Sequence, residues 1–94
     1  MGRLEGKVKS ITAAGDLVTD IALADLGNAP TDDQLTVECE GHKTFGLYPP
    51  QHEQPEMTFL AIQNETGFVQ ISIVGGSASQ FLGIPVDAVV TVTW

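Results

Sequence analysis

The sequence has only one cysteine, Cys39, so it cannot form a disulfide within the chain, and we expect a reducing compartment. Cys39 lies in the alternating run 35-LTVECE-40, which favours a buried, small apolar side chain over a nucleophile. A catalytic thiol needs a nearby histidine, and His42 is three residues away, but two adjacent strands often bring such residues together without chemistry. Together with His52 these residues match no zinc spacing, and a fourth ligand is missing.

Basic residues are also scarce, because four Lys and Arg stand against twelve Asp and Glu, which gives a net charge of −8. Nucleic-acid binding depends on neutralising phosphates with basic side chains, so this balance argues against a nucleic-acid partner and against an anionic membrane surface. Three of the four cations, Arg3, Lys7 and Lys9, lie in the first nine positions. We interpret them as a solvated strand face rather than a phosphate site.

Long apolar runs are absent, since the longest span a few residues and a bilayer needs about 18. The opening residues Met1–Gly6 precede no apolar segment of the kind that signal peptides contain. We therefore expect no membrane association and a cytoplasmic location. A length of 94 residues with 43% hydrophobic residues fits one domain, residues 1–94, with a single modest core.

No stretch with a helical period is long enough to form a major element, whereas short alternating or β-branched runs recur between turn residues. Ser77–Leu82 is predicted to form one or two helical turns, with Ser77 as N-cap and Gly83 just past the end. The fold class predicted is all-β: a small single-domain barrel of about seven strands, in which the last strand pairs with an earlier one. The predicted strands cover residues 3–11, 17–23, 35–39, 43–47, 57–63, 68–74 and 89–94, with loops at 25–33 and 48–56.

Recognisable catalytic motifs are missing as well. Asp16 and Asp20 share a strand face but lie about 13 Å apart, whereas the carboxyl groups of a glycosidase pair lie roughly 5–9.5 Å apart. Asp32-Asp33 has no partner in the sequence, and neither a G-x-S-x-G, a P-loop nor a Rossmann fingerprint is present. Gly75-Gly76 precedes a Ser-Ala-Ser segment without the lysine that a P-loop requires. We therefore expect no enzyme.

The order of the segments carries more information than any single residue. The opening 3-RLEGKVKSITAAGDLVTDI-21, the middle 59-FLAIQNETG-67 and the closing 67-GFVQISIVGGSASQFLGIPVDAVVTV-92 are each similar to a segment of one known domain. That domain is the C-terminal β-barrel of the S-adenosylmethionine (SAM) hydroxide adenosyltransferases and their relatives, the SAM-dependent chlorinases and fluorinases. The resemblance covers nearly the whole chain, with gaps around residues 25–56, and is most specific in the closing segment.

The resemblance implies that the barrel is one wall of a nucleoside pocket, because in this family the N-terminal domain of a neighbouring subunit supplies the rest and the catalytic groups. The family's adenine-stacking Phe falls at Ala14 here, which removes a stacking face worth on the order of 1 kcal/mol. A family Asp falls at Thr12, and an Asn falls at Val74. The positions of the residual pocket are Thr12, Asp16, Asp20, Val74, Gly75, Gly76 and Ser77, where Asp16 and Asp20 replace family Asn residues.

Three functional hypotheses follow. The first is a non-catalytic barrel module with an eroded adenosine pocket, which binds a protein partner or assembles with itself and needs no resident cofactor. The alternative is a residual adenosine- or SAM-binding domain that acts with a separate catalytic chain, in which Asp16 binds a ribose hydroxyl and residues 75–77 offer backbone N–H groups. A hydrolase using Asp16, Asp20, His42 or His52 has the least support, because no nucleophile, base and orienting group can be assembled from the sequence.

Overall fold

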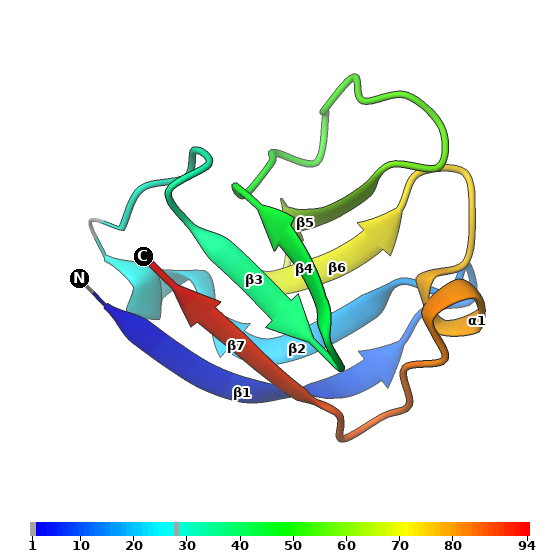
Figure 1. Ribbon diagram of the computed structural model, residues 1–94, viewed down its shortest axis with the longest axis horizontal. Coiled ribbons are helices and arrows are strands. Elements are labelled where there is room, and N and C mark those ends of the chain that lie inside the picture. The colour runs from blue at the N-terminus through cyan, green and yellow to red at the C-terminus, as the bar shows by residue number, and fades with distance from the viewer. Residues whose placement is uncertain (1, 28) are drawn as a thin grey trace.

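The computed structural model describes residues 2–27 and 29–94 as a nearly closed barrel of seven antiparallel strands (Figure 1). The strand order is β4-β3-β7-β1-β2-β6-β5. The strands are β1 (Arg3–Ile11), β2 (Leu17–Ala22), β3 (Thr36–Cys39), β4 (His42–Phe45), β5 (Phe59–Gln63), β6 (Phe68–Ile73) and β7 (Val89–Thr93). The all-β fold class, the three hairpins and the pairing of the last strand with earlier ones, β1 and β3, are confirmed.

The barrel closes between its two end strands through a few specific contacts rather than a ladder. The Thr44 hydroxyl on β4 donates to the carbonyl of Phe59 on β5 at 3.1 Å. Beyond β4 the chain continues as a parallel bridge from Tyr48 to Ile62, in which the Tyr48 N–H donates to the Ala61 carbonyl at 2.9 Å. Side-chain and loop contacts therefore cover the edges that an open sheet would expose.

The core lies inside the barrel and follows the period-two alternation of the strands. Cys39 is 1% exposed and belongs to it, so the prediction of a buried side chain is confirmed. Burial, with the neighbouring Glu40 carboxylate as a smaller cause, raises the pKa of the Cys39 thiol to about 11. The thiol is therefore protonated and shielded at neutral pH, the opposite of what a nucleophilic cysteine needs. The largest fully buried core side chains are Leu17, Leu35, Ile71, Ile84, Val8, Val37, Val69, Val90 and Val92.

The predicted short helix is confirmed as α1 (Ala78–Leu82). The Ser77 hydroxyl accepts a hydrogen bond from the Gln80 N–H at 3.3 Å, and Gly83 ends the helix with φ 67°. The Ser77 cap satisfies a backbone donor that the first turn of this five-residue helix leaves open, and the left-handed Gly83 lets the chain turn away after Leu82.

Several boundary predictions were wrong, and the largest differences have local reasons. The strand predicted over 43–47 is β4, which ends at Phe45, because Gly46 takes φ 88°. Leu23–Leu26 forms a 3-10 helix, η1, where the sequence predicted the end of a strand and the start of a loop. Its Leu26 is buried in the core, so packing of this side chain holds the turn in place. The strand predicted from residue 57 begins only at Phe59, because Met57 takes φ 67° and its N–H donates to the Val74 carbonyl at 2.7 Å.

The cations of β1 lie on the outer face of the barrel, as the alternation predicts. Arg3 pairs with Glu5 at 3.1 Å, and the Lys9 ammonium lies 3.3 Å from the centre of the Phe68 ring. Arg3 and Glu5 are more than half exposed, which supports a solvated strand face at this end of β1. In the part of the chain that the structure describes, no helix is long and apolar enough to cross a membrane.

Candidate functional site

A hollow of the barrel surface lies where β6 passes into the turn before α1. It has a volume of about 530 Å³, which is within the range of small-molecule sites, and it is wide open to solvent. Four parts of the chain line it: the β1–β2 turn, β5, the outer end of β6 with its turn, and the loop between β4 and β5. Its lining residues are Ala14, Asp16, His52, Ile62, Gln70, Ser72, Ile73, Val74, Gly75, Gly76 and Ser77.

The structure brings five of the seven predicted positions together in this hollow: Asp16, Val74, Gly75, Gly76 and Ser77. They come from segments about sixty residues apart in sequence, which meet because the Ser79 N–H donates to the Gly15 carbonyl at 3.0 Å. Gly15 has φ +91°, and a Cβ on it would lie 1.9 Å from the Ser77 hydroxyl oxygen. The β1–β2 turn can therefore approach Ser77 this closely only because residue 15 has no side chain.

Thr12 lies beside the hollow rather than in its lining, and it shapes the turn that carries Asp16. The Thr12 hydroxyl accepts from the Asp16 N–H at 3.1 Å, and the Thr12 carbonyl accepts from the Gly15 N–H at 2.9 Å. Thr12 therefore acts on Asp16 through the backbone of the turn.

Asp20 is not brought to the hollow. Its carboxylate lies over Gly6 on β1 and accepts a hydrogen bond from the Lys7 N–H at 2.8 Å. The β1–β2 ladder is irregular between Val8 and Ser10, and the side chain satisfies a backbone donor near that irregularity. Asp20 thus has a structural role in strand pairing.

The glycine turn offers fewer free donors than the sequence suggests. The Gly76 N–H already donates to the Ile73 carbonyl at 3.0 Å, and the Ser77 hydroxyl is engaged in capping α1. Glu56 lies close to Gly75, since a Cβ on that glycine would be 3.4 Å from the Glu56 Cγ. A carboxylate at this point disfavours a phosphate, so the turn is not a phosphate cradle.

Sequence reasoning missed two polar side chains that line the hollow, Gln70 and Ser72, and it considered a third, His52, only for a hydrolase or a metal set. Gln70 donates through Nε2 to the Ser72 hydroxyl oxygen at 3.1 Å and accepts through Oε1 from the Asn64 side-chain amide. Because Gln70 and Ser72 are two residues apart on β6, the period-two alternation places both on one face and was the available signal. A hydroxyl that accepts one bond keeps its proton to donate to a ligand.

His52 comes from the loop between β4 and β5, and no sequence pattern indicates it. Its Nδ1 accepts from the Gln54 N–H at 3.3 Å, and its ring meets Tyr48 edge-on with centroids 6.5 Å apart. A neutral imidazole whose Nδ1 accepts carries its proton on Nε2, which is then a donor.

The lining therefore combines one carboxylate with neutral donors and acceptors. Among the described residues that form it, none is a lysine or an arginine. No cluster of three or more His, Cys, Asp or Glu suited to a metal ion occurs within residues 2–27 and 29–94. This inventory suits recognition of an uncharged or cationic group by hydrogen bonds.

Two solved structures share the fold. An uncharacterized conserved protein from Thermotoga maritima superposes with a TM-score of 0.78 at 19% identity, over 98% of this chain and 36% of that one. A conserved hypothetical protein from Thermus thermophilus superposes with a TM-score of 0.72 at 22% identity. The match covers 95% of this chain and 34% of that one. The chain thus spans about a third of the length of each structure, and identities this low show the fold alone. No protein-family model matches the sequence. No curated protein matches it.

Proposed function

We propose that the barrel is a non-catalytic module that binds a second polypeptide through the rim of the hollow. The hollow rim consists of Met57, the turn Val74–Gly76 and Phe81. The observation that carries the proposal is the exposure of two large apolar side chains at one turn, since Met57 is 58% exposed and Phe81 is 60% exposed. Methionine and aromatic residues are enriched at protein interfaces, where their burial yields much of the binding free energy.

Both apolar side chains of the rim are positioned by the same turn. The Met57 N–H donates to the Val74 carbonyl at 2.7 Å. The Phe81 ring lies against Gly76, where an added Cβ would be 2.6 Å from the ring. A polypeptide that covers this turn would therefore bury both side chains and close the hollow beside them.

The proposal agrees with the resemblance to the C-terminal barrels of the SAM hydroxide adenosyltransferases, in which another polypeptide domain completes the pocket. It also agrees with the length of the two solved structures, in which the barrel-like part is accompanied by about twice as much further chain. Family membership remains part of the proposal.

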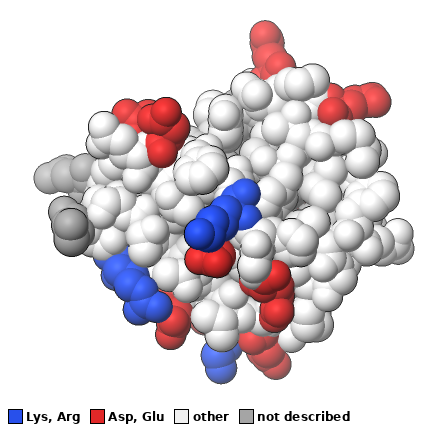
Figure 2. Space-filling view, in the orientation of Figure 1, with Lys and Arg blue, Asp and Glu red and all other residues white. Residues whose placement is uncertain are grey.

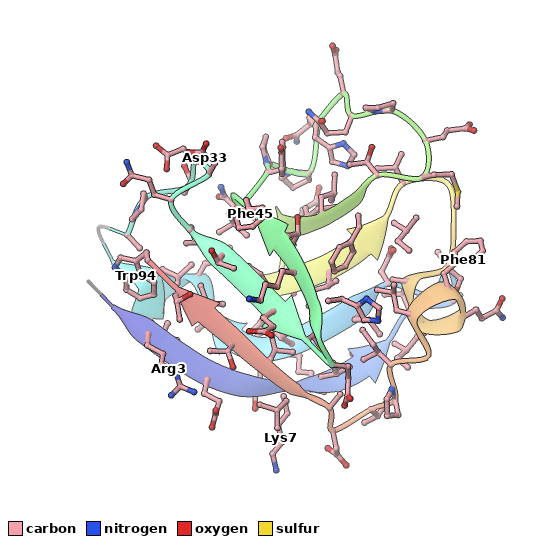
Figure 3. The ribbon with its side chains drawn as sticks, in the orientation of Figure 1. Arg3, Lys7, Asp33, Phe45, Phe81 and Trp94 are labelled. Atoms are coloured by element: carbon pink, nitrogen blue, oxygen red, sulfur yellow. The ribbon has the colours of Figure 1, made fainter. Side chains whose placement is uncertain are left out.

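Site-specific photo-crosslinking tests this function with a control in the same chain. We expect benzoylphenylalanine at position 81 to give a covalent adduct in the producing cells, because the ring lies in the interface. Phe45, which is 56% exposed on β4 and lies on a different side of the barrel, serves as the control (Figure 3). Mass spectrometry of the adduct shows whether the partner is a second copy or another protein. Equal yields at both positions, or no adduct at 81, would contradict the proposal.

A second candidate function is a residual nucleoside site, favoured by the polar lining around Asp16, Gln70 and Ser72. The absence of lysine and arginine from the described lining favours adenosine or the cationic SAM over phosphorylated nucleotides. Calorimetry with adenosine, SAM and AMP tests this, and we expect weak binding of the first two that Asp16→Ala removes. If neither adenosine nor SAM gives heat at millimolar concentration, the hollow is not a nucleoside site.

A further inference from the structure

The hollow continues into a second one along the outer face of the β5–β6 hairpin. The second hollow has a volume of about 290 Å³ and shares Ile62 and Gln70 with the first. The two hollows therefore adjoin at these residues, and the surface that they cover from the turn 64–66 to the turn 74–77 is here called the acidic groove. This path follows β6 from Phe68 to Ile73 and beyond, a length of about 20 Å at the rise of a strand.

The floor and one wall of the acidic groove have different origins. Gln70 and Ser72 of β6 and Ile62 of β5 form the floor, because these positions alternate with the core residues of the same strands. Pro50 and His52 of the loop between β4 and β5 form the wall. Figure 1 shows this loop arching out above β5.

Charge is distributed unevenly around the groove. Each hollow is lined by one carboxylate, Asp16 in the first and Glu65 in the second. Glu53 and Glu56 are exposed on the loop that forms the wall, and Figure 2 shows acidic side chains at the margin of the molecule above this loop. Three of the four cations of the chain lie elsewhere on β1 and β4, namely Arg3, Lys7 and Lys43. The fourth, Lys9, reaches the Phe68 ring at the start of β6.

We infer that the acidic groove binds an extended, basic segment of a protein partner. About six residues of extended chain span 20 Å, and lysine or arginine near each end would face Asp16 and Glu65. The amide of Gln70 and the hydroxyl of Ser72 between them suit the polar backbone of such a segment, and Ile62 suits an apolar side chain. The inference rests on the proposed protein-binding role but uses residues other than Met57 and Phe81.

A second copy of this chain is a poorer occupant. Its basic sequence is in β1, which is hydrogen-bonded to β2 on one side and to β7 on the other. That strand cannot leave the barrel without breaking both ladders, so the segment has to come from another protein.

Fluorescence anisotropy with a labelled, end-blocked heptapeptide of alternating lysine and valine tests the inference. We expect this peptide to bind more tightly than the matched glutamate and valine peptide. Asp16→Asn combined with Glu65→Gln should weaken binding about fivefold to tenfold, which lies within the range of roughly twofold to thirtyfold for two partly exposed ion pairs. The control variant, Asp33→Asn combined with Asp87→Asn, makes the same charge change outside the groove and should weaken binding less than twofold. Asp33 lies across the molecule from Phe81 (Figure 3).

Equal binding of the two peptides, or an equal loss in the control variant, would overturn the inference. If position 81 crosslinks but the basic peptide does not bind, the proposed function stands and the groove assignment fails. Binding of adenosine without binding of the peptide would also overturn it, in favour of the nucleoside candidate.

Discussion

Gly15→Ala is expected to destabilise the protein more than any other single glycine substitution in its turns. An alanine at φ +91° is strained by about 1 kcal/mol, and its Cβ would lie 1.9 Å from the Ser77 hydroxyl oxygen and 2.8 Å from the Ser77 Cα. Rotating the hydroxyl cannot relieve the overlap with backbone, so the β1–β2 turn has to move away from α1. We expect a total loss of roughly 3–5 kcal/mol, which lowers Tm by about 15 °C or more in a domain of this size.

Gly67→Ala is the matched control for this prediction. Gly67 has φ +94°, almost the same as Gly15, but an added Cβ would meet no atom within 4 Å. The control therefore reports the strain of the backbone alone, about 1 kcal/mol. Thermal and urea unfolding of both variants separates the two effects. If Gly15→Ala loses no more stability than Gly67→Ala, the contact between the turn and Ser77 does not hold the hollow together.

Local sequence rules predicted the hairpins and the short helix because the decisive interactions are close in the chain. The caps of α1, for example, join Ser77 to Gln80 and end at Gly83, all within seven residues. The alternation of residues 35–40 likewise predicts a buried Cys39, and its side chain lies in the core. Where a long-range contact decides, as with Leu26 packing into the core after η1, the same rules missed the element.

The candidate site was predictable only in part, for the same reason. The positions suggested by the resemblance include Asp16 and the turn 74–77, which are distant in sequence and line the same hollow. The resemblance also suggested Asp20 as a pocket residue, but its carboxylate accepts a hydrogen bond from the Lys7 N–H and supports the pairing of β1 with β2. His52 enters from an irregular loop whose path depends on what it packs against, so neither periodicity nor turn chemistry indicates it.

The same loop explains an unusual burial on β5. Leu60 is 0% exposed, yet it lies on the face of β5 opposite to Ala61, which belongs to the barrel core. The loop between β4 and β5 lies over this outer face, because His52 and Pro50 share hollows with Ile62 of the same strand. Leu60 is therefore expected to anchor the loop that forms the wall of the acidic groove.

Leu60→Ala is expected to cost about 2–4 kcal/mol of unfolding free energy, as for a core leucine, although its side chain points out of the barrel. If Leu60 anchors the loop between β4 and β5, the substitution should also let this loop open more often. The Tyr48 N–H, which donates to the Ala61 carbonyl, should then exchange with solvent faster. Val89→Ala is the control, since Val89 is 48% exposed on β7 and should change stability by less than about 0.5 kcal/mol. Urea unfolding measures the first effect and hydrogen exchange the second. A loss in Leu60→Ala no greater than in Val89→Ala would show that the loop is not anchored there. The groove would then lack a fixed wall, and the basic segment would have to order the loop as it binds, at a cost in affinity.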